Sequence, residues 1–178
     1  LSASSLTEYF SRMEAATSIA SYDKELMRKL AETREEIEKA RVLRFDELIN
    51  KSNPNIPYSQ CFDDSDFIYD HLIVIDRDNG SVVGTYRLGR REQLEKIGDF
   101  YTNVKFNVDS LMAAEGEVLE LSRMAIRESY RDGSVIKLLW KGLFAYCARF
   151  DVKWLFGIIS LPTTEPDDAL NFLSYINN

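Results

Sequence analysis

Three polar residues interrupt an apolar segment near the middle of the chain, and their side chains could take part in catalysis. Glu120, Ser122 and Arg123 lie within the segment EVLELSRMAI, whose other residues are mostly apolar. A β-strand of this composition is expected to be buried on both faces, where an unpaired charge would cost on the order of several kcal/mol. These charges therefore need partners, either other side chains of the protein or a bound ligand.

Charged residues in three other segments are candidates for those partners. Arg87 lies in the apolar segment VVGTYRL, and Arg44 lies on the apolar face of an expected helix. The acidic segment CFDDSDFIYD supplies carboxylates at Asp63 and Asp66. The spacing leaves two interpretations open: an internal salt-bridge network that joins helix, hairpin and strand, or a polar pocket for a small charged amine.

A second group of candidate residues follows the same strand, in the segment RESYRDGSVI. Gly133 and Ser134 lie where a helix is expected to begin, and Arg127 and Arg131 come just before them. Free backbone N–H groups, the positive end of a helix dipole and two guanidinium groups would suit a phosphate or pyrophosphate ligand. The alternative is that Gly133 is only a turn residue.

Several other chemistries lack their usual residues. The chain has one histidine, His71, so a multi-histidine metal site is excluded and no metal is expected. The position of His71 beside Asp70 at the start of a strand favours a structural role. There is no G-x-S-x-G motif, no P-loop and no G-x-G-x-x-G after a strand. These absences argue against hydrolase triads, nucleotide hydrolysis and dinucleotide redox chemistry.

Size and composition predict one folded domain rather than a disordered chain. The chain has 178 residues, of which 45% are apolar, and its net charge of −7 argues against binding to nucleic acid. The two cysteines have neither a metal spacing nor a disulfide pattern, and Cys147 is expected to pack as a small apolar residue. A reducing, cytoplasmic location is therefore expected. No apolar run is long enough for a transmembrane helix, and a peripheral membrane contact is left open.

The N-terminal half of the chain shows helical patterns followed by a hairpin. A peripheral helix is expected from Ser5 to about Ala20, within an N-terminal segment of residues 1–26, and a short strand over Leu26–Ala31. Thr33 and Glu36 have the form of a capping box and open a helix that runs to about Ile49. The segment HLIVIDRDNGSVVGTYRLG predicts a β-hairpin with its turn at residues 76–80.

The C-terminal half predicts a strand–helix–strand crossover. One short helix and an irregular connection are expected over residues 90–114, before the strand at residues 117–126. The helix SVIKLLWKGLFAYCARF and the buried strand VKWLFGIIS follow, so part of the sheet is parallel. The fold class is therefore α/β with a mixed sheet, in one domain over residues 27–178. The last residues begin a new helix, and further C-terminal elements are expected.

Taken together, these segments resemble the GNAT acyltransferase superfamily. The resemblance rests on HLIVIDRDNGSVVGTYRL, FYTNVKFNVDSL, VLELSRMAIRESYRDGSVIKLLWKGLFAY and WLFGIIS, and it covers roughly residues 30–175. T-Y-R-L followed by E-L-S-R is its most specific part. The branch that it resembles contains ornithine-lipid acyltransferases, often labelled hemolysin-like, N-acyl amino acid synthases and acyl-homoserine-lactone synthases.

The resemblance implies a splayed mixed sheet with helices on both faces and a thioester donor lying between the strands at residues 117–126 and 153–160. The donor would be acyl-CoA or the phosphopantetheine arm of an acyl carrier protein, and no cofactor would be permanently bound. The phosphate loop after Arg131 is shorter than the family's pattern, so the choice of donor stays open. The donor site would comprise Met124, Ala125, Ile126, Arg127, Arg131, Gly133 and Ser134.

By match to the same branch, a set of polar residues would form the acceptor and catalytic site. These residues are Arg44, Phe45, Asp63, Asp66, Arg87, Glu120, Ser122 and Arg123. We expect an N-acyltransferase in which the amine of a small amino-acid-like acceptor attacks the thioester directly. Glu120 is the candidate base, directly or through a water, and Asp63 and Asp66 would hold the amine. Arg87 or Arg123 would hold the acceptor carboxylate or orient Glu120.

Strand geometry adds one expectation. Glu120 and Arg123 are an odd number of residues apart, so a β-bulge between them is predicted to bring both side chains to one face.

Two alternative functions stay open. One alternative is an acyl-homoserine-lactone-type synthase, although the aromatic residues expected after Phe45 are only partly present. The other is a non-catalytic ligand-binding protein of the same fold.

Overall fold

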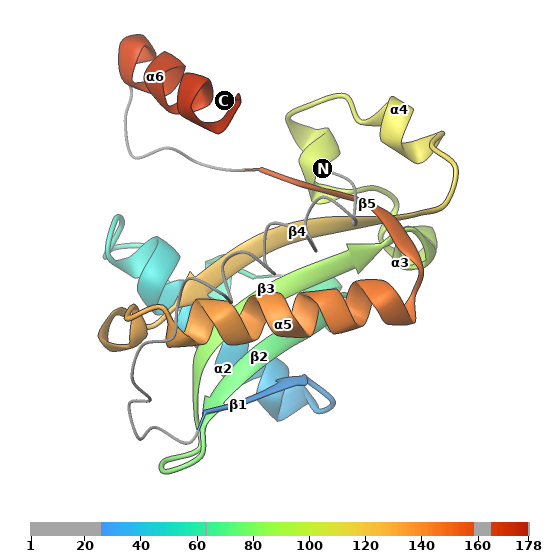
Figure 1. Cartoon of the computed structure of the whole chain (residues 1–178). Coiled ribbons are helices and arrows are strands. Elements are labelled where there is room, and N and C mark those ends of the chain that lie inside the picture. Colours follow the sequence, from blue (N-terminus) through green and yellow to red (C-terminus); the bar gives the residue numbers. More distant parts are fainter. Residues whose placement is uncertain (1–25, 63, 159–164, 178) are drawn as a thin grey trace.

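The computed structural model describes residues 26–62, 64–158 and 165–177 (Figure 1). The helix expected from Ser5 to Ala20 and the candidate residue Asp63 therefore lie outside the described residues. The strand expected at the start of the domain is present as β1 (Leu26–Leu30).

The described residues form a five-stranded mixed sheet, as expected, in the order β1-β2-β3-β4-β5. Strands β2 (Asp70–Asp76) and β3 (Ser81–Arg90) form the predicted hairpin. Strand β4 (Glu117–Ile126) pairs antiparallel with β3, and β5 (Val152–Gly157) pairs parallel with β4. The strand–helix–strand crossover predicted from the sequence is confirmed.

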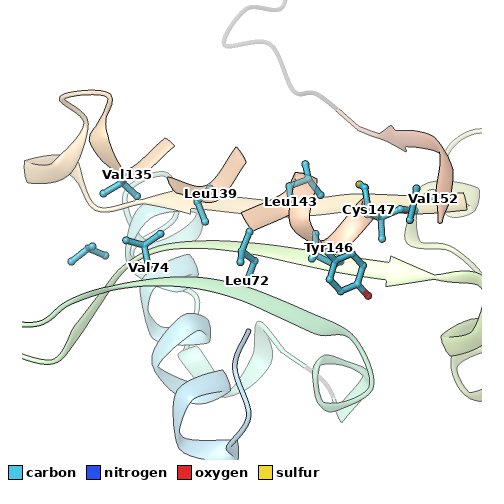
Figure 2. Close-up of a cluster of buried hydrophobic side chains, with 11 residues drawn as sticks. Leu72, Val74, Val135, Leu139, Leu143, Tyr146, Cys147 and Val152 are labelled. Atoms are coloured by element: carbon cyan, nitrogen blue, oxygen red, sulfur yellow. The ribbon is translucent and has the colours of Figure 1, made fainter. Parts of the chain in front are cut away.

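Helices cover both faces of this sheet (Figure 1). Helix α5 (Ser134–Arg149) lies on one face, where Leu139 and Leu143 pack on Leu72 and Val74 of β2. Figure 2 shows this cluster, which also contains Cys147 as the small buried residue that was expected. Burial raises the pKa of the Cys147 thiol to about 11, so it stays protonated at neutral pH.

Helix α2 (Arg34–Arg44) lies on the opposite face, where Ala40 and Leu43 pack on Ile73 of β2. The Thr33 hydroxyl accepts a hydrogen bond from the backbone N–H of Glu36 at 3.2 Å. The Glu36 carboxylate, however, accepts from the backbone N–H of Glu32 rather than of Thr33, so half of the expected capping box forms. The helix continues to Asn50, as a π-helical turn over Phe45–Asn50.

Two expectations about the C-terminal half were wrong. The connection after β3 contains two α-helices, α3 (Arg91–Ile97) and α4 (Asp109–Met112), where one was expected. Strand β5 was expected to be buried, but Trp154 is 43% exposed. Because β5 pairs on one side only among the described residues, its apolar side chains lie at an edge of the sheet. The last described helix is α6 (Pro166–Asn177).

The pairing of β4 with β5 ends earlier along β4 than the pairing of β4 with β3 does. The pairing with β5 stops at Leu121 and Gly157, whereas β4 stays paired with β3 as far as Ile126. At Gly157 a Cβ atom would lie 2.3 Å from the backbone oxygen of Leu121, so the two strands can approach this closely only with a glycine there. Beyond this point β4 has no β5 partner among the described residues.

Candidate active site

A β-bulge in β4 shapes the centre of the candidate site. Along β3, Thr85 pairs with Ala125 and Arg87 pairs with Ser122, so one extra residue of β4 lies between the pairs. Arg123 occupies this bulge with φ of 57°, a conformation that is uncommon for a residue other than glycine. A bulge was predicted between Glu120 and Arg123, and the structure has it slightly further along β4, between Ser122 and Ala125.

Three polar side chains lie side by side across the sheet on the face covered by α2. His71 of β2 pairs in register with Arg87 of β3, which in turn pairs with Ser122 of β4. The Arg87 Nε donates a hydrogen bond to the Ser122 hydroxyl at 3.0 Å. All three residues are buried, so they depend on one another and on the loop that precedes β2 for polar partners.

Asp66, in the 3₁₀ turn Asp64–Phe67, accepts hydrogen bonds from two arginines at once. Arg44 donates Nη2 to Oδ2 at 2.8 Å and Nη1 to Oδ1 at 3.2 Å, and Arg87 donates to Oδ1 at 3.1 Å. Burial alone would raise the pKa of Asp66, but the charges of Arg44 and Arg87 outweigh it and hold the pKa below its ordinary value. Asp66 is thus an ionised carboxylate whose oxygens are already in use.

His71 supports the same loop and has the structural role expected from the sequence. Its Nε2 lies 2.7 Å from the backbone oxygen of Asp66, which can only accept, so Nε2 carries the proton. Burial, followed by the charge of Arg44, lowers the pKa of His71 to about 4. The imidazole is therefore neutral at neutral pH.

Glu120 lies in the same region but does not form an ion pair with any described Lys or Arg. Its side chain is fully buried, and its oxygens accept backbone N–H groups of Tyr101 at 3.1 Å and of Thr102 at 2.6 Å. Both backbone groups belong to the 3₁₀ turn Tyr101–Val104. Its assignment as the general base stays a prediction.

A small polar pocket opens among the arginines of this network. Its cavity volume is about 30 Å³, enough for one small polar group, and its lining comprises Arg44, Cys61, Phe62, Asp66, Arg87 and Arg123. Among the described residues that line it, three guanidinium groups face one carboxylate, which gives this lining a net positive charge. An anionic group of a ligand fits this balance better than an ammonium group does.

The aromatic residue expected beside Arg44 packs next to the pocket but does not line it. The Phe45 ring lies edge-on to Tyr58, with centroids 5.3 Å apart, and Tyr58 packs similarly on Phe62. Phe62 in turn lies under the guanidinium of Arg44 at 5.1 Å. Phe45 therefore supports the pocket wall through two other rings.

The expected phosphate loop follows the C-terminal end of β4, and carboxylates already occupy part of it. The backbone N–H and the hydroxyl of Ser134 both donate to Asp132, at 2.9 and 2.6 Å. Gly133 adopts φ of 94° to begin α5, a conformation that favours glycine. The first N–H group of this helix is thus capped from within the loop.

The two arginines of this loop contact acidic residues of the π-helical turn. Arg131 donates to Glu47 at 2.7 Å, and Arg127 lies 3.8 Å from Asp46. Lys51 also donates to Glu47, whose side chain is only 5% exposed. The loop therefore carries less net positive charge than its own residues indicated.

The structure brings most of the predicted acceptor residues together and adds others that the sequence reasoning missed. Arg44, Asp66, Arg87, Ser122 and Arg123 form one cluster, and Met124, Ala125 and Ile126 follow them along β4. Cys61 and Phe62, which line the pocket, were missed, as were Tyr69 and Tyr101, whose ring centroids lie 4.2 and 5.6 Å from Cζ of Arg87. Tyr101 lies within FYTNVKF, and no spacing rule connects it with residues of β3 and β4. Tyr101 lies near these residues because the connection between α3 and β4 folds back onto the sheet.

Two further observations concern the described residues only. They include no group of three or more His, Cys, Asp or Glu side chains that could hold a metal ion. No helix within residues 26–62, 64–158 and 165–177 is long and apolar enough to cross a membrane.

Comparison with known proteins places the chain among acyltransferases. Residues 40–141 match the family model of the acetyltransferase (GNAT) domain. The chain is 33% identical over 162 residues to an L-ornithine N(alpha)-acyltransferase of Brucella abortus, covering 84% of this chain and 58% of that protein. It is 31% identical over 147 residues to one of Rhodobacter capsulatus, covering 77% and 57%. The chain thus spans little more than half the length of these relatives.

Solved structures share the fold at low sequence identity. An N-acyl amino acid synthase from uncultured soil microbes matches with a TM-score of 0.57 and 11% identity, covering 84% of this chain and 76% of that one. An aminoglycoside N-acetyltransferase in complex with CoA matches with a TM-score of 0.52 and 13% identity, covering 89% and 90%. The mixed sheet with helices on both faces is the fold of these proteins.

Proposed function

The chain belongs to the GNAT acetyltransferase family, and on that premise we propose that it transfers an acyl group from a thioester donor to the amine of a small amino acid such as ornithine. The observation that carries the proposal is the pocket lined by three arginines at the bulge of β4. The activity named for the relatives supports it, although the chain spans only part of their length.

The charges of the pocket support an acceptor that carries a carboxylate. Arg44 and Arg87 already share Asp66, whereas Arg123 forms no ion pair with a described carboxylate. We assign the acceptor carboxylate to Arg123, with Arg87 beside it. The cavity has room for that group but not for a whole amino acid, so the amine would lie outside it.

The contacts of Asp66 support a different role from holding the amine. Because its oxygens are taken by Arg44 and Arg87, it fixes the positions of these guanidinium groups. An internal salt-bridge network alone would account for these three residues. It leaves Arg123 without a counter-charge among the described residues, which is why we favour a ligand site.

The same arginines would help to generate the nucleophile. An amine held near several guanidinium groups has a lowered pKa, because nearby positive charge disfavours its protonated form. The neutral amine nitrogen attacks the thioester carbonyl carbon, a C–N bond forms, the C–S bond breaks, and the amine proton leaves with a base while the thiolate takes up a proton. Glu120 can act as that base only if a substrate or a water reaches its buried carboxylate.

For the donor, the contacts of the loop before α5 favour a ligand with few charges. Asp132 caps Ser134, and Glu47 engages Arg131, so a highly charged nucleotide would meet carboxylates as well as arginines. The phosphopantetheine arm of a carrier protein has a single phosphodiester. We therefore propose an acyl carrier protein as the donor, with acyl-CoA as the alternative.

A thiol-release assay tests the proposal. Acyl carrier protein and CoA donors are crossed with ornithine, other amino acids, and putrescine, which has the same amines as ornithine without the carboxylate. We expect release with ornithine and little with putrescine. No release with any amino acid would overturn the transferase assignment, and equal rates with putrescine would overturn the carboxylate assignment alone.

A further inference from the structure

The connection between α3 and β4 brings the ring of Tyr101 to two of the arginines that line the polar pocket. Phe100 is fully buried, and its ring packs edge-on against Phe156 of β5 with centroids 4.8 Å apart. The 3₁₀ turn that starts at Tyr101 follows directly. Phe100 thus anchors the start of this turn against the sheet.

Glu120 fixes the same turn from the other side. The first N–H groups of a helical turn have no partner within it, and here those of Tyr101 and Thr102 donate to the two oxygens of Glu120. A fully buried carboxylate is costly unless hydrogen bonds compensate its charge. The contacts that Glu120 makes are therefore those that hold the turn in place.

The ring of Tyr101 faces two of the pocket's arginines. Its centroid lies 4.9 Å from Cζ of Arg123 and 5.6 Å from Cζ of Arg87, both within the range of a cation–π contact. Among the described residues, this ring is the partner of the Arg123 guanidinium. The ring therefore contacts the end of a side chain whose backbone lies in the bulge.

From these contacts we propose that Tyr101 belongs to the acceptor site and that Glu120 is a positioning residue. Glu120 holds the backbone of Tyr101, and the Tyr101 ring holds the guanidinium groups of Arg123 and Arg87 at the spacing that receives the acceptor carboxylate. The inference rests on the proposed function. It also gives Glu120 a role other than proton abstraction, and kinetic measurements can distinguish the two roles.

The two roles of Glu120 predict different kinetic changes. A lost general base lowers kcat by about 10²- to 10⁴-fold and leaves the acceptor KM unchanged. A lost positioning contact raises the acceptor KM, because the guanidinium groups of Arg123 and Arg87 are no longer held at the spacing that receives the acceptor carboxylate. In Glu120→Gln the amide keeps one acceptor oxygen but turns an N–H group toward the other backbone donor, so the turn loses one of its two hydrogen bonds.

The kinetic test compares variants of Tyr101 and Glu120 in the thiol-release assay with ornithine. Tyr101→Leu removes the π face and is expected to raise the ornithine KM about 2- to 30-fold, the range of a cation–π contact. Tyr101→Phe keeps the ring and should recover most of that loss. Glu120→Gln should raise the same KM, and the double variant with Tyr101→Leu should add less than the sum of the two effects.

Phe106→Leu is the matched control, because this aromatic residue lies in the same connection but is 58% exposed. Its ornithine KM should equal that of the wild type. An unchanged KM in Tyr101→Leu, or a Glu120→Gln variant that loses kcat alone, would overturn the proposal.

A second readout does not depend on turnover and separates this inference from the proposed function. Amide hydrogen exchange at Tyr101 and Thr102 should accelerate in Glu120→Gln and stay unchanged in Phe106→Leu. The Nε–H signal of Arg123 in NMR spectra should shift in Tyr101→Leu. If wild-type protein releases no thiol, the proposed function fails, and unchanged exchange together with an unchanged Arg123 signal shows that the positioning inference fails as well.

Discussion

Arg44 and Asp66 form a two-point ion pair between helix α2 and the loop that precedes β2. Nη2 lies 2.8 Å from Oδ2 and Nη1 lies 3.2 Å from Oδ1, and the two residues are only 1% and 2% exposed. Arg87 of β3 reaches the same carboxylate. One aspartate thus joins helix, loop and sheet.

Removing the carboxylate of Asp66 should lower the stability of the protein. Asp66→Asn leaves Arg44 and Arg87 buried without a counter-charge, and we expect the free energy of unfolding to fall by about 3–5 kcal/mol in urea titrations. Glu35→Gln, which breaks the exposed pair with Lys39 on the same helix, should change it by less than about 1 kcal/mol. Equal effects of the two substitutions would contradict a buried network.

Stability should fall in mildly acidic solution because of His71. Its pKa is about 4 in the folded protein against an ordinary value of 6.5, so between these pH values the unfolded chain binds more protons than the folded one. The contribution is fully present above the ordinary value and is lost progressively as pH falls toward the folded value. The carboxylates of Glu36 and Asp66, whose pKa values are also lowered, begin to lose their contributions only as pH falls through their ordinary values of 4.5 and 3.8, at the acidic end of this interval and below it.

Urea midpoints measured across this pH range test that expectation. Because the chain has a single histidine, His71→Asn should flatten the decline between about pH 6.5 and the folded pKa of about 4. If wild type and variant lost stability in parallel over that interval, the decline would belong to other groups.

The sequence predicts the sheet well because its strands have clear local signals. The hairpin β2–β3 has β-branched residues on each side of an Asp-Asn-Gly turn, and the segment that forms α5 is long and apolar nearly all round. The exposure of β5 was not predicted, because an edge strand and a central strand can have equally apolar sequences. The apolar composition of a strand does not show whether a neighbouring strand pairs with it on both sides.

The candidate site was predicted in part. Charges in apolar segments had to find partners, so Arg44, Asp66, Arg87 and Arg123 could be grouped from their residue types and positions alone. The assignment of partners was beyond the sequence, because it depends on register: the extra residue at Arg123 decides which β4 side chains face α2. Tyr101 was missed since its contact with Arg123 is made by an irregular connection.

The bulge predicts a conflict between stability and function at Arg123. Its φ of 57° suits asparagine better than arginine, so Arg123→Asn should leave the free energy of unfolding unchanged or raise it by up to about 1 kcal/mol. The same substitution removes the guanidinium and should raise the ornithine KM by tenfold or more. Each tenfold rise corresponds to a loss of about 1.4 kcal/mol in binding free energy. Urea titration and the thiol-release assay measure the two effects. Loss of both stability and affinity would show that Arg123 is part of the framework.

The loop before α5 allows the choice of donor to be altered. Asp132→Ala removes a carboxylate from the helix N-terminus and frees the backbone N–H and hydroxyl of Ser134. We expect the KM for acyl-CoA to fall, since its phosphates would meet a free donor and one negative charge fewer. The KM for an acyl carrier protein donor should change less. The lost cap should also lower the free energy of unfolding by about 0.5–2 kcal/mol.

A control at the opposite end of α5 separates local from overall charge. Asp151 is 84% exposed on its side chain and pairs with Lys153, so Asp151→Ala also removes one negative charge but lies after the helix C-terminus. Its donor KM values should equal those of the wild type. If Asp132→Ala left the KM for acyl-CoA unchanged, Asp132 would not be what disfavours the nucleotide, and the preference for a carrier protein would lose its structural basis.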